Sequence, residues 1–139
     1  MNLKRSKVDM IEDEMIMNKI YILRGKKVMI DEDLAILYNS GSAKLKNIIR
    51  RNTLCFPDDF MFKLNHLDFE SLKMQNSTIL RPYPDTEFPL AFTEQGLAML
   101  FGLVKGARSI AINIRIIRIF TLIRRVLPDA PELHNLKCN

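Results

Sequence analysis

Two short amphipathic helices joined by a turn of small residues, over residues 31–52, most constrain the fold of this chain. The first helix is predicted from an apolar face made by Leu34, Ala35, Leu37 and Tyr38. Asp31 is its expected N-cap, and the run Asn39-Ser40-Gly41 is expected to end it. Such a pair, a helix-turn-helix, is built to place its second helix in the major groove of DNA.

The second predicted helix of the pair, with Ser42 as its expected N-cap, is apolar on one side and basic on the other. Its outer side and flanks carry five candidate DNA-binding residues: Lys44, Lys46, Asn47, Arg50 and Arg51. Asn47 matches the edge of adenine and Arg50 that of guanine, each with two hydrogen bonds, whereas the other three would bind phosphates. The alternative is a solvated helix face that is basic without binding a ligand.

A β-hairpin is predicted ahead of the helix pair, from β-branched runs at residues 19–23 and 27–30 with Gly25 in the turn. Its basic residues Arg24, Lys26 and Lys27 are candidates for contacting a phosphate or the minor groove. Solubility of the turn is the alternative explanation for their charge. A proline-rich loop that carries Lys73 and Arg81 is a candidate wing.

The remaining pattern completes an α+β prediction, with an N-terminal β-hairpin, a helix-turn-helix-like pair, short strands and two C-terminal helices. Short strands are expected at residues 60–64 and 88–92, and helices at 66–74, 93–105 (capped by Thr93) and 107–126. The domain is predicted to span residues 17–126. A flexible arm or frayed helix is expected at residues 1–16, and a tail or linker at residues 127–139.

The helix expected at residues 107–126 is apolar over more than half of its circumference, and this favours either a central place in the core or an intermolecular contact. A homodimer through this helix is therefore a candidate assembly. Its arginines lie on a narrow stripe of Arg108, Arg115, Arg118 and Arg125. We expect that stripe to be the solvated edge of a packed helix, with Arg118 pairing an acid such as Glu94, rather than a second phosphate-binding surface.

The net charge of +5 favours polyanionic partners, because the cations gather in acid-free stretches at residues 34–57 and 95–128. No nucleophile, base or metal-ligand spacing stands out, so neither enzyme activity nor a cofactor or metal is expected. The chain has only two cysteines and no apolar run at its N-terminus, and both features favour a cytoplasmic protein. Arginines interrupt its most hydrophobic segment, so no membrane span is predicted.

Six local motifs, in order, resemble the KilA-N-like DNA-binding domains of phage antirepressors, in particular the N-terminal domain of an Orf-type antirepressor. The most extended are Asp33-Leu34-Ala35-Ile36-Leu37-Tyr38, the run Phe56-Pro57-Asp58-Asp59-Phe60, and Pro89-Leu90-Ala91-Phe92-Thr93-Glu94-Gln95-Gly96. The resemblance runs from about residue 17 to 125. It implies a hairpin followed by a helix-turn-helix-like pair, and DNA binding in a phage or prophage setting.

The chain departs from the family pattern at Ala43, Lys46 and Cys55. We therefore keep two hypotheses. The first is a DNA-binding domain of a phage-derived transcriptional regulator or antirepressor, which would bind double-stranded DNA on the nucleoid of a bacterial host. The second is a protein-interaction module that binds a repressor or host factor without specific DNA contact.

Overall fold

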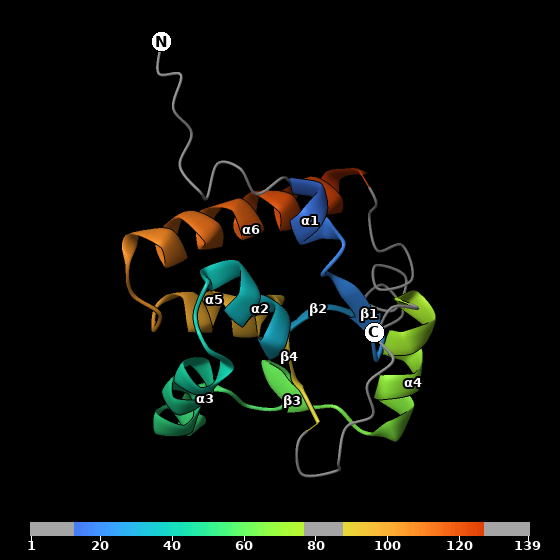
Figure 1. Ribbon diagram of the computed structural model, residues 1–139. Helices are drawn as coiled ribbons and strands as arrows, with labels where there is room; N and C mark the ends of the chain where they lie inside the picture. The colour runs from blue at the N-terminus through green and yellow to red at the C-terminus, as the bar shows by residue number, and fades with distance from the viewer. Residues whose placement is uncertain (1–12, 77–87, 127–139) are drawn as a thin grey trace, which may run out of the picture.

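A four-stranded antiparallel sheet forms the centre of the computed structural model, which describes residues 13–76 and 88–126 (Figure 1). The strands lie in the order β1 (Tyr21–Leu23), β2 (Lys26–Ile30), β4 (Leu90–Thr93) and β3 (Met61–Lys63). The predicted hairpin is confirmed as β1 and β2, joined at Arg24 (φ 55°) and Gly25 (φ 76°). Two successive residues in the left-handed region make the tight turn whose twist suits a hairpin.

Side chains of the sheet alternate between two hydrophobic clusters, as the period of two in a strand requires. In β2, Val28 and Ile30 enter one cluster and Met29 enters the other; in β4, Ala91 and Phe92 divide in the same way. Helix α4 (His66–Gln75) covers the first cluster, and all the other helices contribute to the second. The fold is therefore α+β, as predicted, with a helical layer on each face of the sheet.

The second cluster, on the face opposite α4, is the larger of the two and positions the helix pair. It is built by α1 (Asp13–Met17), α2 (Asp31–Tyr38), α3 (Ser42–Arg51), α5 (Glu94–Phe101) and α6 (Ala107–Val126), with the short 3₁₀ helix η1 (Thr53–Cys55) after α3. The bounds of α6 agree with the prediction, whereas the helix expected at 93–105 ends at Phe101. No helix within the described residues is long and apolar enough to cross a membrane.

Helix α1 corrects the prediction of a loose arm or frayed helix for residues 13–16. Ile16 is fully buried in the larger cluster, and Asp13 is joined to Arg115 of α6 by a 2.8 Å ion pair. Burial of Ile16 and the ion pair of Asp13 therefore join α1 to the rest of the fold. Residues 1–12 of the predicted arm, the tail at 127–139 and the loop residues 77–87, including Arg81, lie outside the described residues.

The caps expected for the helix pair are also corrected. Asp31 is the first residue of α2 rather than its N-cap, which is Ile30, and Gly41 rather than Ser42 is the N-cap of α3. Neither Ile30 nor Gly41 offers a side-chain oxygen, so the two helices begin without side-chain capping. The break between the helices is confirmed, since Asn39 adopts the left-handed conformation (φ 55°).

The start of α5 depends on a close approach of two backbones. The Thr93 side chain caps the helix by accepting from the Gly96 N–H at 3.3 Å, as predicted, and its hydroxyl also donates to the Asp59 carbonyl at 2.7 Å. A Cβ on Gly96 would lie 1.8 Å from the carbonyl oxygen of Phe60. Only glycine fits at this position, which accounts for a residue that otherwise weakens the first turn of a helix.

Candidate nucleic-acid interface

The helix pair is fixed by the burial of one face of each helix. Leu34 and Leu37 of α2, and Leu45 and Ile49 of α3, all enter the larger cluster. Because the apolar residues of α3 follow a helical period, burying Leu45 and Ile49 turns the opposite side of that helix outward. Figure 1 shows α3 at the lower left, at the margin of the fold.

The outer side of α3 is accessible, as DNA binding requires. Lys44, Asn47, Arg50 and Arg51 are exposed, and Lys46 is half-buried. A guanidinium nitrogen of Arg50 donates to the Asn47 side-chain oxygen at 3.3 Å, so the two candidate base-reading residues lie side by side. These four exposed residues, with half-buried Lys46 beside them on the same helix, are what we call the α3 surface.

A buried carboxyl group, Asp31 of α2, interacts electrostatically with Lys46 of α3 and is 1% exposed. One of its oxygens accepts from the backbone N–H of Glu32 at 2.9 Å and of Leu90 at 3.3 Å, joining α2 to β4. The other oxygen has no hydrogen-bond partner among the described residues. Burial raises the pKa of Asp31 to about 6, and the attraction of Lys46 partly opposes this rise.

The basic residues of the hairpin lie apart from the α3 surface. The Arg24 guanidinium makes two bonds to Asp68 of α4, at 3.2 and 2.7 Å, and lies 3.9 Å from the centroid of the Phe62 ring. Asp68 also belongs to the capping box of α4 with Asn65, and its pKa is lowered by its Arg24 and Asn65 hydrogen bonds, against the opposing effect of burial. Arg24 thus fastens the hairpin to α4, next to Lys26, which is exposed, and Lys27, which is half-buried.

The arginine stripe of α6 is partly engaged within the fold. Arg108 donates to the Leu37 carbonyl at 3.2 Å, and Arg115 pairs with Asp13. The predicted pairing of Arg118 with Glu94 is wrong, because Arg124 makes the ion pair with Glu94 instead. The charge of Arg115 is thus paired within the fold, and Arg108 is held by one hydrogen bond to a backbone carbonyl, whereas Arg118 and Arg125 are exposed.

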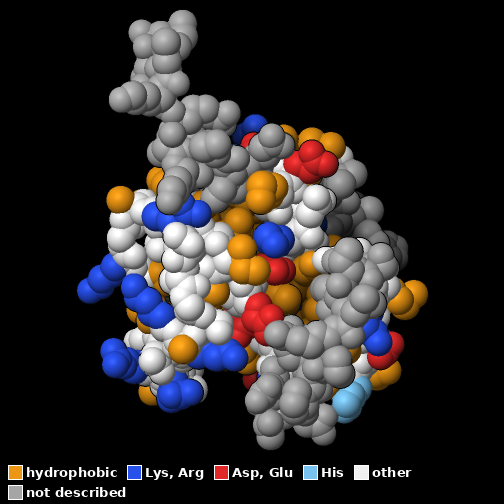
Figure 2. Space-filling view, viewed as in Figure 1, with side chains coloured by type: hydrophobic (Ala, Val, Ile, Leu, Met, Phe, Trp, Pro, Cys, Tyr) orange, Lys and Arg blue, Asp and Glu red, His pale blue; other side chains and the backbone are white. Residues whose placement is uncertain are grey.

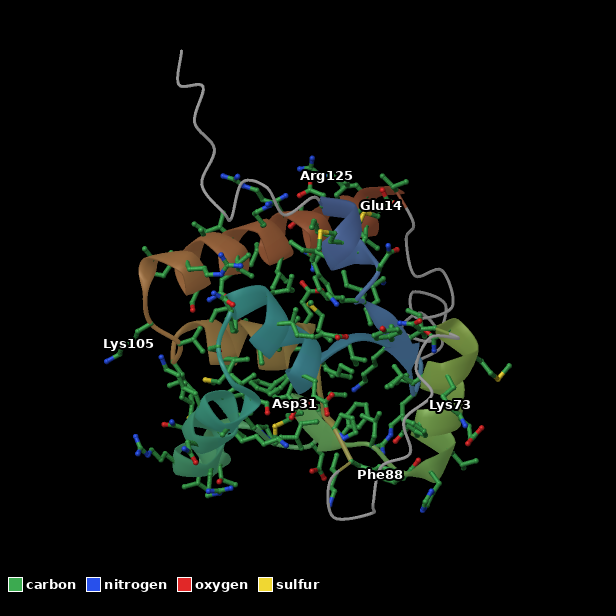
Figure 3. The ribbon with its side chains drawn as sticks, in the orientation of Figure 1. Glu14, Asp31, Lys73, Phe88, Lys105 and Arg125 are labelled. Carbon is green, nitrogen blue, oxygen red and sulfur yellow. The ribbon has the colours of Figure 1, made fainter. Side chains whose placement is uncertain are left out.

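Sequence reasoning missed one residue beside the α3 surface, Lys105 in the loop between α5 and α6. Its side chain points outward above α3 at the left of Figure 3, and Figure 2 shows lysine and arginine side chains gathered over the same side of the molecule. The sequence feature that could have indicated Lys105 is the acid-free stretch at residues 95–128, in which it is the only lysine. Lys73, which was predicted to belong to a wing, lies on α4, away from α3 in Figure 3, and pairs with Glu70 at 3.2 Å.

Potential metal ligands do not gather in the part of the chain that the structure describes: no three His, Cys, Asp or Glu side chains form a group there. His66 instead packs its ring edge-to-face against Phe88, with the centroids 4.9 Å apart. Cys55 is half-buried against the larger cluster.

Comparison with known proteins shows that residues 18–103 match a family model described as the ORF6N domain. The matched segment is more than half of the chain and contains the hairpin, the helix pair and α5; it stops short of α6. No curated protein and no solved structure matched the chain.

Proposed function

Because this chain belongs to the ORF6N domain family, which occurs in phage-related proteins, we propose that it is a DNA-binding regulatory domain. In this proposal it acts within a phage- or prophage-derived transcriptional regulator or antirepressor, as the KilA-N-like resemblance implies. It works by binding double-stranded DNA and not by catalysis.

The observation that carries the proposal is the accessible, basic outer side of α3. The helix is held by two buried residues, Leu45 and Ile49, and it directs Lys44, Asn47, Arg50 and Arg51 to solvent. Its composition includes no acid, so no carboxylate on α3 itself repels a phosphate. A ten-residue helix with these properties is suited to the major groove, where Arg50 and Asn47 would reach base edges and the lysines would bind phosphates.

Fluorescence anisotropy with a labelled random-sequence duplex, titrated at rising salt, tests the proposal. We expect binding at low salt that weakens steeply as salt increases, because each phosphate contact releases counterions. Arg50→Ala should weaken binding at 0.15 M salt by about fivefold or more. The matched control is Arg125→Ala, which removes the same charge from the exposed C-terminal end of α6, far from α3 in Figure 3.

Loss of affinity in Arg50→Ala with little change in Arg125→Ala supports the α3 surface as the DNA interface. Equal losses in the two variants would mean that the interface has been placed on the wrong side of the molecule. A wild-type chain that fails to bind the duplex even at low salt would eliminate the DNA-binding function.

A second candidate function, protein binding, is favoured by an exposed apolar face on α6. Ile110, Ile114 and Ile117 are 53%, 43% and 52% exposed, and their i, i+4, i+7 spacing aligns them along one side of the helix. Leu122 and Val126, nearer the end of α6, are exposed as well but lie on another side of the helix. Such a face fits a helix from a second copy of the chain or from a repressor or host factor.

Sedimentation of the wild-type chain and of Ile114→Glu distinguishes these partners. A concentration-dependent dimer that Ile114→Glu dissociates would support a homodimer through α6. A wild-type chain that sediments as a monomer throughout would remove the homodimer and leave only binding to a different protein.

A further inference from the structure

A hollow of about 290 Å³ lies beside the α3 surface, between α3 and the loop that joins α5 to α6. Its walls come from the end of α2 and the turn after it, from Lys44, Leu45 and Ile48 of α3, and from residues 104–109. Three cations line it: Lys44, Lys105 and Arg108. Among the described residues that line the hollow there is no aspartate or glutamate, so the net charge of this lining is positive.

The three cations of the hollow come from two parts of the chain that the fold brings together: Lys44 from α3, and Lys105 and Arg108 from residues 104–109. Lys44 and Lys105 are exposed at the rim, and Figure 3 shows Lys105 extending from the loop on the same side as α3. Arg108 is half-buried, and its Nε atom donates to the Leu37 carbonyl, which holds the guanidinium group in the inner wall. The hollow therefore has one anchored cation and two that can adjust to a ligand.

The uncharged part of the lining also suits an oxyanion. Asn39, Ser40 and Ser109 line the hollow, and their amide and hydroxyl groups can donate hydrogen bonds to a phosphate oxygen. Lysine and arginine supply most contacts to DNA phosphates, with hydroxyl and amide side chains adding further ones. The hollow offers each of these groups.

We propose that this hollow binds a phosphate of the DNA backbone next to the groove that α3 enters. The inference rests on the proposed DNA-binding function and extends its interface to a part of the fold that lies beyond the family match at residues 18–103. Lys44 belongs to both the α3 surface and the hollow, so one strand of a duplex engaged by α3 passes the hollow at its rim. The loop between α5 and α6 then contacts that strand from the other side.

The test is the salt dependence of duplex binding by the full chain and by three variants: Lys105→Ala, Arg50→Ala and Arg125→Ala. Losing one phosphate contact should make the plot of log affinity against log salt less steep by about one unit. It should also weaken binding at 0.15 M salt by about fivefold. We expect this result for Lys105→Ala, whereas Arg125→Ala should retain the wild-type slope. Because Lys105 is exposed, its truncation should leave the thermal unfolding temperature unchanged, which is measured alongside.

The outcomes separate this inference from the proposed function. If the wild-type chain binds, Arg50→Ala weakens it and Lys105→Ala keeps the wild-type slope, then the hollow takes no phosphate although α3 binds DNA. If Lys105→Ala and Arg125→Ala lower the slope equally, the effect is one of net charge and the hollow is again eliminated. If the wild-type chain does not bind a duplex at all, both the function and the inference fail.

Discussion

The substitution Asp31→Asn should remove a pH-dependent loss of stability that the buried carboxyl group imposes on this fold. Asp31 is 1% exposed, and one of its oxygens has no hydrogen-bond partner among the described residues. Its pKa rises from 3.8 to about 6 on folding because burial disfavours the charged form. At about 1.4 kcal/mol per pKa unit, that rise corresponds to about 3 kcal/mol.

The sign follows from which state binds the proton. Below pH 3.8 the carboxyl group is protonated in both states, so it adds no pH-dependent term. Between pH 3.8 and about 6 the folded chain keeps the proton while the unfolded chain has lost it, so stability falls as the pH rises. Above about pH 6 both states are ionised, and the free energy of unfolding has fallen by its full amount, about 3 kcal/mol.

Urea unfolding of the wild-type chain and of Asp31→Asn at intervals from pH 3.5 to 7.5 measures the effect. Asparagine keeps the oxygen that accepts from Glu32 and Leu90, so the contact between α2 and β4 can persist. The free energy of unfolding of the variant minus that of the wild type should rise by about 3 kcal/mol over this range. Groups such as Asp33 and Asp68 titrate in both proteins and cancel to first order in the difference. A difference that is the same at every pH would refute the reasoning.

Two further predictions concern packing. Gly96→Ala should lower the free energy of unfolding by about 3 kcal/mol or more, because its Cβ would meet the Phe60 carbonyl oxygen at 1.8 Å. Gly102→Ala, whose Cβ would have an ordinary 3.6 Å contact, is the control in thermal unfolding, and similar losses in both would contradict the steric explanation. Tyr38→Phe should cost about 1–3 kcal/mol, since it leaves the buried Asn113 oxygen without its hydroxyl donor. In urea unfolding, the double variant with Tyr38→Phe and Asn113→Leu should lose less free energy of unfolding than the two single variants lose together. Strict additivity would show that the hydrogen bond contributes nothing to stability.

The sequence predicted the elements whose signals are local. The hairpin follows from β-branched runs around Gly25, and α6 from twenty residues with helical periodicity. The outward direction of the α3 basic residues was also predictable, because Leu45 and Ile49 mark the buried side of that helix. These features depend on residues close together in the chain.

The features that sequence reasoning missed depend on contacts between distant residues. Arg24 is bonded to Asp68, which lies 44 residues further along the chain, so its charge is paired within the fold and joins the hairpin to α4. Asp31 accepts a hydrogen bond from the backbone N–H of Leu90, 59 residues away. This contact explains why an acid stands at a position that the local pattern assigns to a helix cap. Lys105 joins Lys44 only because α6 folds back over α2.

Helix α6 closes the hydrophobic interior that the segment matched by the family model leaves open. The segment that the family shares stops at residue 103, yet Ile112, Ile116, Ile119 and Phe120 of α6 fill the larger cluster. Tyr38 and Leu37 of α2 are bonded to Asn113 and Arg108 of the same helix. A chain ended at residue 103 would therefore expose to water the apolar side chains that α6 covers.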